Sequence, residues 1–203
     1  MTIDDIMRVS PVIPVLVLEG EGNWTKLAET FVRAGLRVLE VTLRTPEALE
    51  AIRTMAKVPG AIVGAGTVLN ERQLGEALDA GSQFIVSPGL TEPLAMAVIE
   101  SGVAYLPGVA TAGDIMRGME LGLDRFKFFP AEASGGVAAL KALSAPFAQA
   151  RFCPTGGVRP DTAAEWLAMP SVLCVGGTWF YRGVEDAFET VADRARTAAA
   201  LRI

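Results

Sequence analysis

The sequence predicts one (β/α)₈ barrel domain spanning residues 1–203, and three observations lead to this fold class. Short apolar runs rich in β-branched residues alternate with alanine-rich stretches, which indicates a parallel sheet whose strands alternate with helices. Eight such runs begin about 23 residues apart on average, a length that fits one strand, one helix and two short loops. No G-x-G-x-x-G motif follows the first run, which disfavours the alternative of an open doubly wound sheet.

The predicted strands share a length of six to eight residues and an apolar character. They cover residues 11–18, 38–44, 61–66, 84–89, 104–109, 125–131, 151–157 and 171–177. Intervening segments such as 70–80 and 91–101 carry apolar residues at helical spacing. Eight strand–helix units in a short chain favour a closed barrel at the small end of its size range.

Composition excludes several classes of function. The net charge is −5 without a basic run, so neither nucleic acid nor an anionic membrane is an expected partner. The apolar run at 12–18 is too short to cross a bilayer, and we expect a cytoplasmic protein. The absence of histidine excludes a Ser-His-Asp triad and a histidine-based zinc site. We expect no metal and no cofactor, and the alternative is a magnesium site built from carboxylates. Cys153 and Cys174 are expected to pack within strands.

Glycine and proline gather at the ends of the predicted strands, as in Pro88-Gly89, Pro107-Gly108 and Gly176-Gly177. Each pair alone is equally well explained as turn chemistry. Together they mark one rim, the C-terminal face, where barrel enzymes carry their active sites.

Lys127 lies inside a predicted strand, whereas the other lysines, Lys26, Lys57 and Lys141, lie in helical or loop segments. A strand of a closed barrel has no solvent face, and a lysine is rarely buried unless it is paired or functional. A desolvated lysine supplies the free amine that a Schiff-base nucleophile needs. The alternative is a structural lysine that is paired with a carboxylate or reaches the rim.

The second predicted strand, 38–44, offers partners for this lysine. Strand periodicity places Glu40, Thr42 and Arg44 on one face, which we expect to point into the barrel toward Lys127. Arg44 is suited to a substrate carboxylate and Glu40 to proton transfer. The alternative is an ion cluster of Glu40, Arg44 and Lys127 that satisfies itself.

The last two predicted strands end in Gly156-Gly157 and in Gly176-Gly177-Thr178. Loops after strands seven and eight are the usual phosphate site of such barrels, and glycines let backbone N–H groups approach the phosphate oxygens. These stretches contain no lysine or arginine, although Arg159 and Arg182 are nearby.

Five short motifs occur in order along nearly the whole chain. They are EVTLRT (40–45), GAGTVL (64–69), SPG (87–89), KFFPAE (127–132) and CPTGG (153–157). With these motifs the sequence closely resembles a known family, the class I 2-keto-3-deoxy-6-phosphogluconate (KDPG) and 4-hydroxy-2-oxoglutarate aldolases. The resemblance is weaker over about residues 183–203.

The resemblance implies a homotrimeric barrel that reversibly cleaves KDPG to pyruvate and D-glyceraldehyde 3-phosphate in the Entner–Doudoroff pathway. It assigns the Schiff base to Lys127 and proton transfer to Glu40. The substrate-binding positions that it implies are Arg44 and Thr67 at the pyruvate carboxylate, Pro88 and Phe129 along the pocket, and Gly156, Gly157, Gly177 and Thr178 at the phosphate.

Other functions remain open at this point. Related enzymes act on 4-hydroxy-2-oxoglutarate or on 6-phospho-2-dehydro-3-deoxygalactonate. A metal-dependent barrel aldolase or isomerase would need a further carboxylate at the rim, for which Glu132 is the obvious candidate. A non-catalytic phosphometabolite-binding barrel would not need a buried amine.

Overall fold

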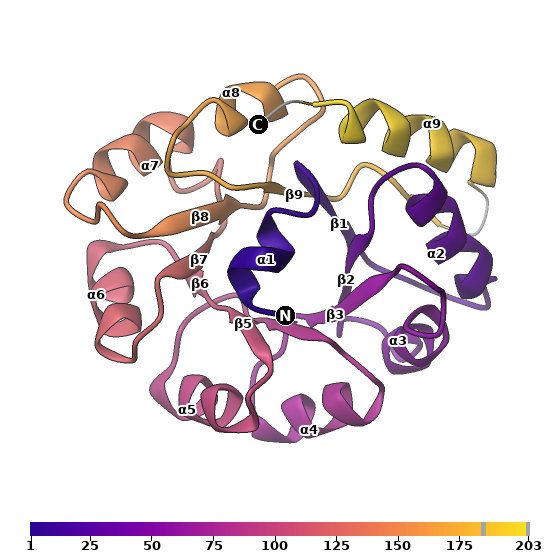
Figure 1. The fold of residues 1–203 in the computed structure, drawn as a ribbon, viewed down its shortest axis with the longest axis horizontal. Coiled ribbons are helices and arrows are strands. Elements are labelled where there is room, and N and C mark those ends of the chain that lie inside the picture. The colour runs from indigo at the N-terminus through magenta and orange to yellow at the C-terminus, as the bar shows by residue number, and fades with distance from the viewer. Residues whose placement is uncertain (184–185, 202–203) are drawn as a thin grey trace.

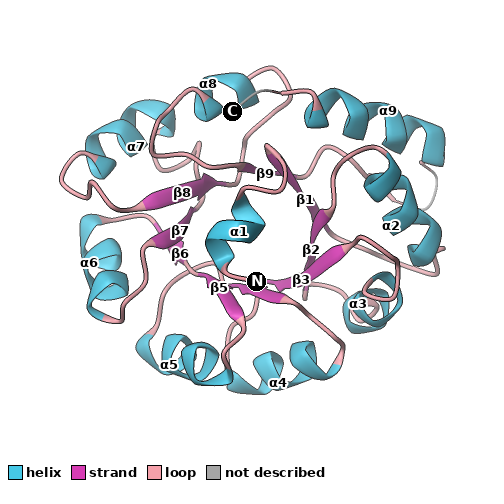
Figure 2. Ribbon diagram, in the orientation of Figure 1, coloured by secondary structure: helices cyan, strands magenta, loops and turns pink. Residues whose placement is uncertain are grey.

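The computed structural model describes residues 1–183 and 186–201, and it shows a ring of parallel strands surrounded by helices (Figures 1 and 2). The strands are β1 (Val12–Leu16), β2 (Val38–Thr42), β3 (Ile62–Gly66), β4 (Phe84–Val86), β5 (Ala104–Leu106), β6 (Gly108–Val109), β7 (Arg125–Phe128), β8 (Arg151–Pro154) and β9 (Val175–Gly177). The helices are α1 (Ile3–Met7), α2 (Trp24–Arg33), α3 (Ala48–Met55), α4 (Glu71–Asp79), α5 (Glu92–Ser101), α6 (Ala112–Glu120), α7 (Gly136–Ser144), α8 (Ala163–Leu167) and α9 (Phe188–Ala199).

The strands form a closed barrel, as the sequence predicts, and not an open sheet. The six-stranded sheet has the order β5-β4-β3-β2-β1-β9, and the three-stranded sheet has the order β6-β7-β8. Bridges from Phe152 to Val172 and from Thr155 to Gly176 join the β8 side to the β9 side. The first and last strands, β1 and β9, pair in parallel, so the ring closes.

The fifth predicted strand, 104–109, is divided by Pro107 into β5 and β6. Proline has no N–H to donate to a sheet ladder, which explains the interruption. Its carbonyl still accepts a hydrogen bond from the Lys127 N–H at 2.8 Å, so the backbone continues around the ring.

Several predicted strands continue too far at their C-terminal ends. The structure ends β2 at Thr42 rather than at 44, β4 at Val86 rather than at 89, and β8 at Pro154 rather than at 157. Apolar character continues into the glycine- and proline-rich turns, so the composition of a run does not mark where its strand ends.

The predicted helical segments 70–80 and 91–101 correspond to α4 and α5, and both begin where a capping residue stands. Asn70 caps α4 by accepting a hydrogen bond from the Gln73 N–H at 3.0 Å. Thr91 is the N-cap residue of α5; its backbone is extended, and its side chain makes no capping hydrogen bond. Among residues 1–183 and 186–201, no helix has the length and apolar character needed to span a membrane.

Two apolar clusters fill the molecule, one between strands and helices and one inside the barrel. Leu39 and Val41 of β2 belong to the outer cluster and Val38 to the inner one, so the predicted alternation is confirmed there. Helix α1 contributes Ile6 and Met7 to the inner cluster and lies across the ring of strands in Figure 1.

The short helix α1 covers the N-terminal end of the barrel. Asp4 of α1 forms an ion pair of 2.5 Å with Arg125, the first residue of β7. Because the strands are parallel, this contact leaves the opposite end, where the glycine- and proline-rich turns lie, as the end for ligand binding.

Candidate active site

Lys127 points into the barrel interior from β7. Its neighbours Phe126 and Phe128 belong to the outer apolar cluster, so strand alternation turns Lys127 inward. The residue is 6% exposed, and its Nζ donates a hydrogen bond to Oε1 of Glu40 at 2.9 Å. The lysine Nζ also lies 5.4 Å from the centre of the Phe129 ring. The buried strand lysine that the sequence predicts is therefore paired with the predicted carboxylate.

Glu40 fits inside the barrel because β3 carries glycines opposite it. A Cβ built on Gly66 would lie 2.3 Å from Oε1 of Glu40, and one on Gly64 would lie 2.5 Å from the Phe84 ring. The two glycines thus leave room for one catalytic candidate and for one apolar side chain below it. The two glycines of the GAGTVL motif are therefore required by packing, because a side chain at either position would collide with Glu40 or Phe84.

The Lys127–Glu40 pair is costly to bury. Removing each charge from water costs several kcal/mol in a protein interior, and a buried ion pair is often no more stable than apolar residues of equal volume. Both side chains are less than 10% exposed, so solvent does little to compensate. The pair therefore contributes little to the stability of the fold, and a catalytic role explains its burial better.

The structure corrects the expectation that Arg44 shares the buried face of β2. Arg44 lies in the turn after the strand, is exposed, and donates its backbone N–H to the Thr42 carbonyl at 2.8 Å. The period-two pattern fails there because the strand has already ended. The alternative of an ion cluster of Glu40, Arg44 and Lys127 is therefore wrong, and Arg44 lies in the exposed turn at the C-terminal end of β2.

Thr67, Pro88 and Phe129 follow the ends of three strands on this rim, and each is half-buried. Thr67 has a φ of 60°, an unfavourable conformation for a β-branched residue that occurs mostly where surrounding structure enforces it. Pro88 is held against β6, where a Cβ on Gly108 would lie 2.1 Å from the Pro88 carbonyl oxygen.

The glycine-rich loops lie where the sequence places them. Gly156 and Gly157 follow β8 with φ of 97° and 85°, values that favour glycine. Gly177 is buried at the end of β9, and Thr178 after it is exposed.

The arginine nearest in sequence to these loops is already paired. Arg159 makes two hydrogen bonds to Asp161, of 3.0 and 3.1 Å. The hydrogen bond to Asp161 is the main reason that the pKa of Arg159 is raised. Its guanidinium is therefore engaged with a carboxylate beside the loops.

Glu132 is held by a tryptophan. Its Oε1 accepts a hydrogen bond from the Trp166 Nε1 at 3.1 Å. Among residues 1–183 and 186–201, no group of three or more histidine, cysteine, aspartate or glutamate side chains is placed to hold a metal ion.

The family model for KDPG and KHG aldolases matches residues 3–192. A 2-dehydro-3-deoxy-phosphogluconate aldolase of Zymomonas mobilis is 52% identical over 200 residues, with 98% of this chain and 96% of the relative covered. A KHG/KDPG aldolase of Escherichia coli strain K12 is 54% identical, with 87% of this chain and 83% of the relative covered. The chain belongs to the KDPG and KHG aldolase family.

Solved structures of family members share the fold closely. The Zymomonas mobilis ZM4 KDPG aldolase, crystallised with 3-phosphoglycerate, superposes with a TM-score of 0.96 at 52% identity, covering 98% of this chain and 96% of that one. A Legionella pneumophila KDPG aldolase with pyruvate captured as a covalent carbinolamine superposes at 0.93 and 38% identity, covering 98% and 99%. The protein is a class I aldolase, a carbon–carbon lyase, which excludes a non-catalytic binding barrel.

Sequence reasoning missed two pairs of residues that support the aldolase site. Ser87 Oγ lies 2.7 Å from the Tyr105 hydroxyl and donates to the Gly89 carbonyl, so it holds the SPG turn. Burial raises the pKa of Tyr105. The second pair is Glu132 with Trp166, which lie 34 residues apart. Neither pair has a local signal, because each partner comes from a separate strand–helix unit.

The two cysteines lie inside the aldolase barrel as packing residues. Cys153 and Cys174 are free, buried and part of the inner cluster. A hydrogen bond with Cys153, followed by burial, raises the pKa of Cys174 well above its usual range. A thiol with a raised pKa stays protonated and is a weak nucleophile.

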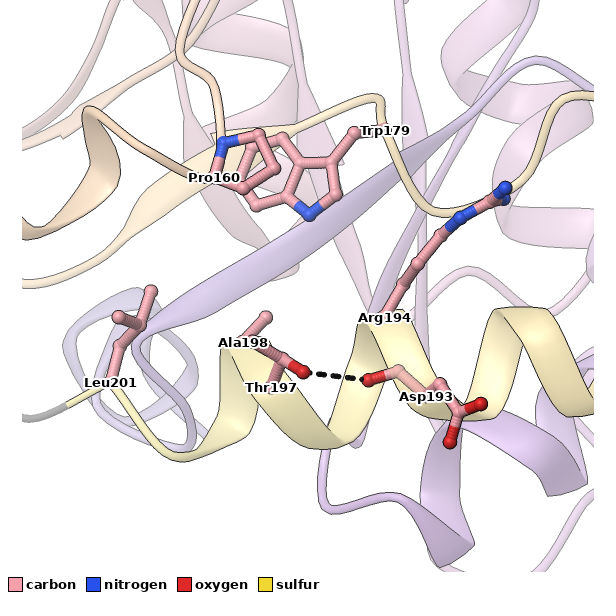
Figure 3. A pocket seen from close by; sticks show the side chains of 7 residues that line it. All are labelled: Pro160, Trp179, Asp193, Arg194, Thr197, Ala198 and Leu201. Atoms are coloured by element: carbon pink, nitrogen blue, oxygen red, sulfur yellow. Dashed lines mark hydrogen bonds between the residues drawn. The ribbon is translucent and has the colours of Figure 1, made fainter.

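A separate apolar pocket of about 290 Å³ lies behind the end of β9 (Figure 3). Trp179, which follows Thr178, forms one wall with Pro160, and α9 forms the other. A Cβ on Gly177 would lie 2.1 Å from the Trp179 ring. The residues lining this pocket are Pro160, Trp179, Asp193, Arg194, Thr197, Ala198 and Leu201, which include none of the predicted catalytic or binding residues.

Proposed function

We propose that this aldolase cleaves KDPG reversibly to pyruvate and D-glyceraldehyde 3-phosphate, as in the Entner–Doudoroff pathway, through a Schiff base on Lys127. The observation that carries the proposal is the buried contact of 2.9 Å between Lys127 Nζ and Glu40 Oε1. Lys127 on β7 and Glu40 on β2 come from opposite sides of the ring and meet in its interior. They place a nucleophile and a base within hydrogen-bond distance, as amine catalysis requires.

The chemistry begins at the C2 ketone of the substrate. Glu40 takes a proton from the Lys127 ammonium, and the free amine adds to C2 to give a carbinolamine. Glu40 gives this proton to the departing hydroxyl, which leaves as water, so an iminium forms and Glu40 is a carboxylate again. Glu40 then takes the C4 hydroxyl proton as the C3–C4 bond breaks, and the bond electrons move into the iminium to form an enamine.

The aldehyde leaves at this point, and Glu40 returns the proton to C3 of the enamine. Water then hydrolyses the resulting iminium to pyruvate and regenerates the Lys127 amine. One carboxylate thus serves first as a base and then as an acid, which is consistent with a chain that lacks histidine.

The rim residues bind the two ends of the substrate in this proposal. Arg44 and Thr67 hold the carboxylate next to the reacting C2, and Pro88 and Phe129 line the channel. An exposed guanidinium on the turn after β2 and a constrained threonine after β3 are suited to a carboxylate above Lys127.

The phosphate binds at the other side of the rim, to the N–H groups of Gly156, Gly157 and Gly177 and to the Thr178 hydroxyl. Two left-handed glycines after β8 and an exposed hydroxyl after β9 support this placement. The paired state of Arg159 favours binding by backbone rather than by an arginine cluster.

Borohydride reduction in the presence of pyruvate tests the Schiff base. We expect one pyruvyl adduct per chain, at Lys127, as measured by mass spectrometry of the intact chain and its peptides. The other lysines, Lys26, Lys57 and Lys141, are exposed and serve as internal controls. An adduct on one of them, or no adduct, would contradict the proposal.

A second substrate, 4-hydroxy-2-oxoglutarate, is favoured by the name of the Escherichia coli relative, a KHG/KDPG aldolase. It shares the keto acid end that Lys127 and Arg44 would bind but has no phosphate. The ratio of kcat/KM for the two substrates decides between them, and we expect it to favour KDPG. The same comparison with 6-phospho-2-dehydro-3-deoxygalactonate tests the stereochemistry at C4.

We also propose a homotrimer located in the cytoplasm. Exposed apolar side chains before α4, on α5 and on α6 support self-association, since these helices are neighbours around the barrel (Figure 1). They are Leu69, Met96, Ile99 and Met116. Light scattering coupled to gel filtration measures the mass of the assembly, and Met116→Glu should lower that mass.

The proposed cytoplasmic location follows from the substrate, because a phosphorylated, charged metabolite does not cross a membrane unaided.

A further inference from the structure

The turn after β7 is attached to the loop that carries the paired glycines. The Ala131 N–H donates to the Thr155 carbonyl at 2.8 Å, and the Glu132 N–H donates to the Gly156 carbonyl at 3.0 Å. The backbone that leaves the Lys127 strand thus lies directly beside the proposed phosphate loop.

The side chain of Glu132 is fixed from behind by α8. Its Oε1 accepts from the Trp166 indole at 3.1 Å, and Trp166 is fully buried against Phe128. A buried indole N–H without a partner would carry a desolvation penalty, so this hydrogen bond favours one position of the Glu132 carboxylate although the residue itself is exposed.

The aliphatic part of the Glu132 side chain packs against Gly157. A Cβ built on Gly157 would lie 2.6 Å from both the Cβ and the Cγ of Glu132. On the other side, a Cβ on Gly156 would lie 3.2 Å from the Phe129 ring. The two glycines are therefore flanked by one aromatic ring and one glutamate stem, while Gly157 stays exposed on its other side. Glycine has access to more backbone conformations than any other residue, so these two neighbours restrict which conformations the loop can adopt.

We propose that Glu132 is a positioning residue that sets the enzyme's preference for phosphorylated substrates. Held by Trp166, its stem keeps Gly156 and Gly157 in the conformation that presents their N–H groups to the phosphate. This inference rests on the phosphate site proposed above. It gives Glu132 a structural role at the phosphate end instead of the role of a further carboxylate in a metal-dependent barrel.

The change Glu132→Ala tests the role of the stem. We expect KM for KDPG to rise roughly 5- to 30-fold, the factor that corresponds to one or two kcal/mol. The kcat/KM for unphosphorylated 2-keto-3-deoxygluconate should stay unchanged, and competitive inhibition by inorganic phosphate should weaken. General damage to the fold would affect both substrates alike, so the difference between them isolates the loop.

The matched control is Glu132→Gln, which keeps both the stem and an oxygen that accepts from Trp166. We expect its KM for KDPG to stay within about threefold of the unchanged enzyme, as for substitutions that preserve packing. A loss as large as that of Glu132→Ala would show that the charge matters, which overturns the proposal. Trp166→Phe removes the N–H donor, and an unchanged KM there would contradict the anchoring role of Trp166.

Thr178→Val distinguishes failure of this inference from failure of the phosphate site. If Thr178→Val selectively weakens the phosphorylated substrate and Glu132→Ala does not, the phosphate site stands and the role of Glu132 is wrong. If neither change is selective, the phosphate binds elsewhere and both proposals are wrong. Selective losses in both variants, with Glu132→Gln preserved, support both.

Discussion

The barrel interior and the glycine-rich rim differ in how they are built. Inside, Lys127 and Glu40 are charged side chains that are nearly fully buried and that meet from opposite sides of the ring of strands. On the rim, Gly156 and Gly157 offer backbone N–H groups on a loop, and Thr178 is exposed. Side-chain chemistry needs exclusion of water, whereas an anion is held adequately by backbone dipoles. Substitutions in the two regions should therefore differ in size and kind.

The largest effect is expected for Lys127→Ala. It removes the nucleophile, so aldol cleavage and adduct formation with pyruvate should both be abolished. It also leaves Glu40 as an unpaired buried charge, which typically costs about 3–5 kcal/mol of stability. Thermal unfolding measures that cost, and the double change with Glu40→Gln should recover part of it. Measurable cleavage in a folded Lys127→Ala enzyme would contradict the mechanism.

Glu40→Gln comes next, because it keeps the shape of the side chain and removes the base. We expect cleavage to fall roughly 10²- to 10⁴-fold, the usual contribution of general acid–base catalysis. Exchange of the pyruvate methyl protons with solvent should slow as well. The pyruvate adduct at Lys127 should still form, but more slowly, because Glu40 no longer takes the proton from the ammonium. Near-normal exchange would place the base elsewhere, with Glu132 or a water held by the pocket as the next candidates.

Thr178→Val is the matched test on the rim, since it removes a hydroxyl at nearly constant volume. Hydrogen bonds to charged groups contribute about 1.5–3 kcal/mol, so kcat/KM for the phosphorylated substrate should fall roughly 10- to 150-fold. An unphosphorylated analogue should be little affected. An equal loss for both substrates would mean that Thr178 supports the fold or the chemistry.

Arg44→Ala should have a smaller effect, because the guanidinium is exposed and solvent weakens its contact with a carboxylate. We expect KM for keto acids to rise by about tenfold with little change in kcat, the pattern of lost ground-state binding. Steady-state kinetics with both substrates measures this. A fall in kcat with unchanged KM would give Arg44 a part in the chemical step.

The smallest expected effect is that of metal removal. Lys127 supplies the electron sink in the proposed mechanism, so treatment with EDTA should leave activity unchanged. Activity assays before and after dialysis against the chelator check this. Loss of activity that a divalent cation restores would require a different mechanism.

The sequence predicted the interior better than it predicted the rim. Strand periodicity and the rarity of buried lysine identified Lys127 and Glu40 correctly as interior residues, because both rules follow from burial. The same periodicity misplaced Arg44, since no sequence rule marked the end of β2 after Thr42. The sequence also identified Gly156 and Gly157 as a pair, but it did not predict that Phe129 and Glu132 would pack against them.

The sequence by itself determined the alternation of strands and helices, the exclusion of histidine chemistry and the residue types available for catalysis. These depend on composition and local spacing, which a chain carries before it folds. The tertiary structure alone decided that Glu40 bonds Lys127 across 87 residues and that Glu132 bonds Trp166 across 34. It also made β1 and β9 neighbours. Such contacts join distant strand–helix units, and their distances exist only after the barrel has closed.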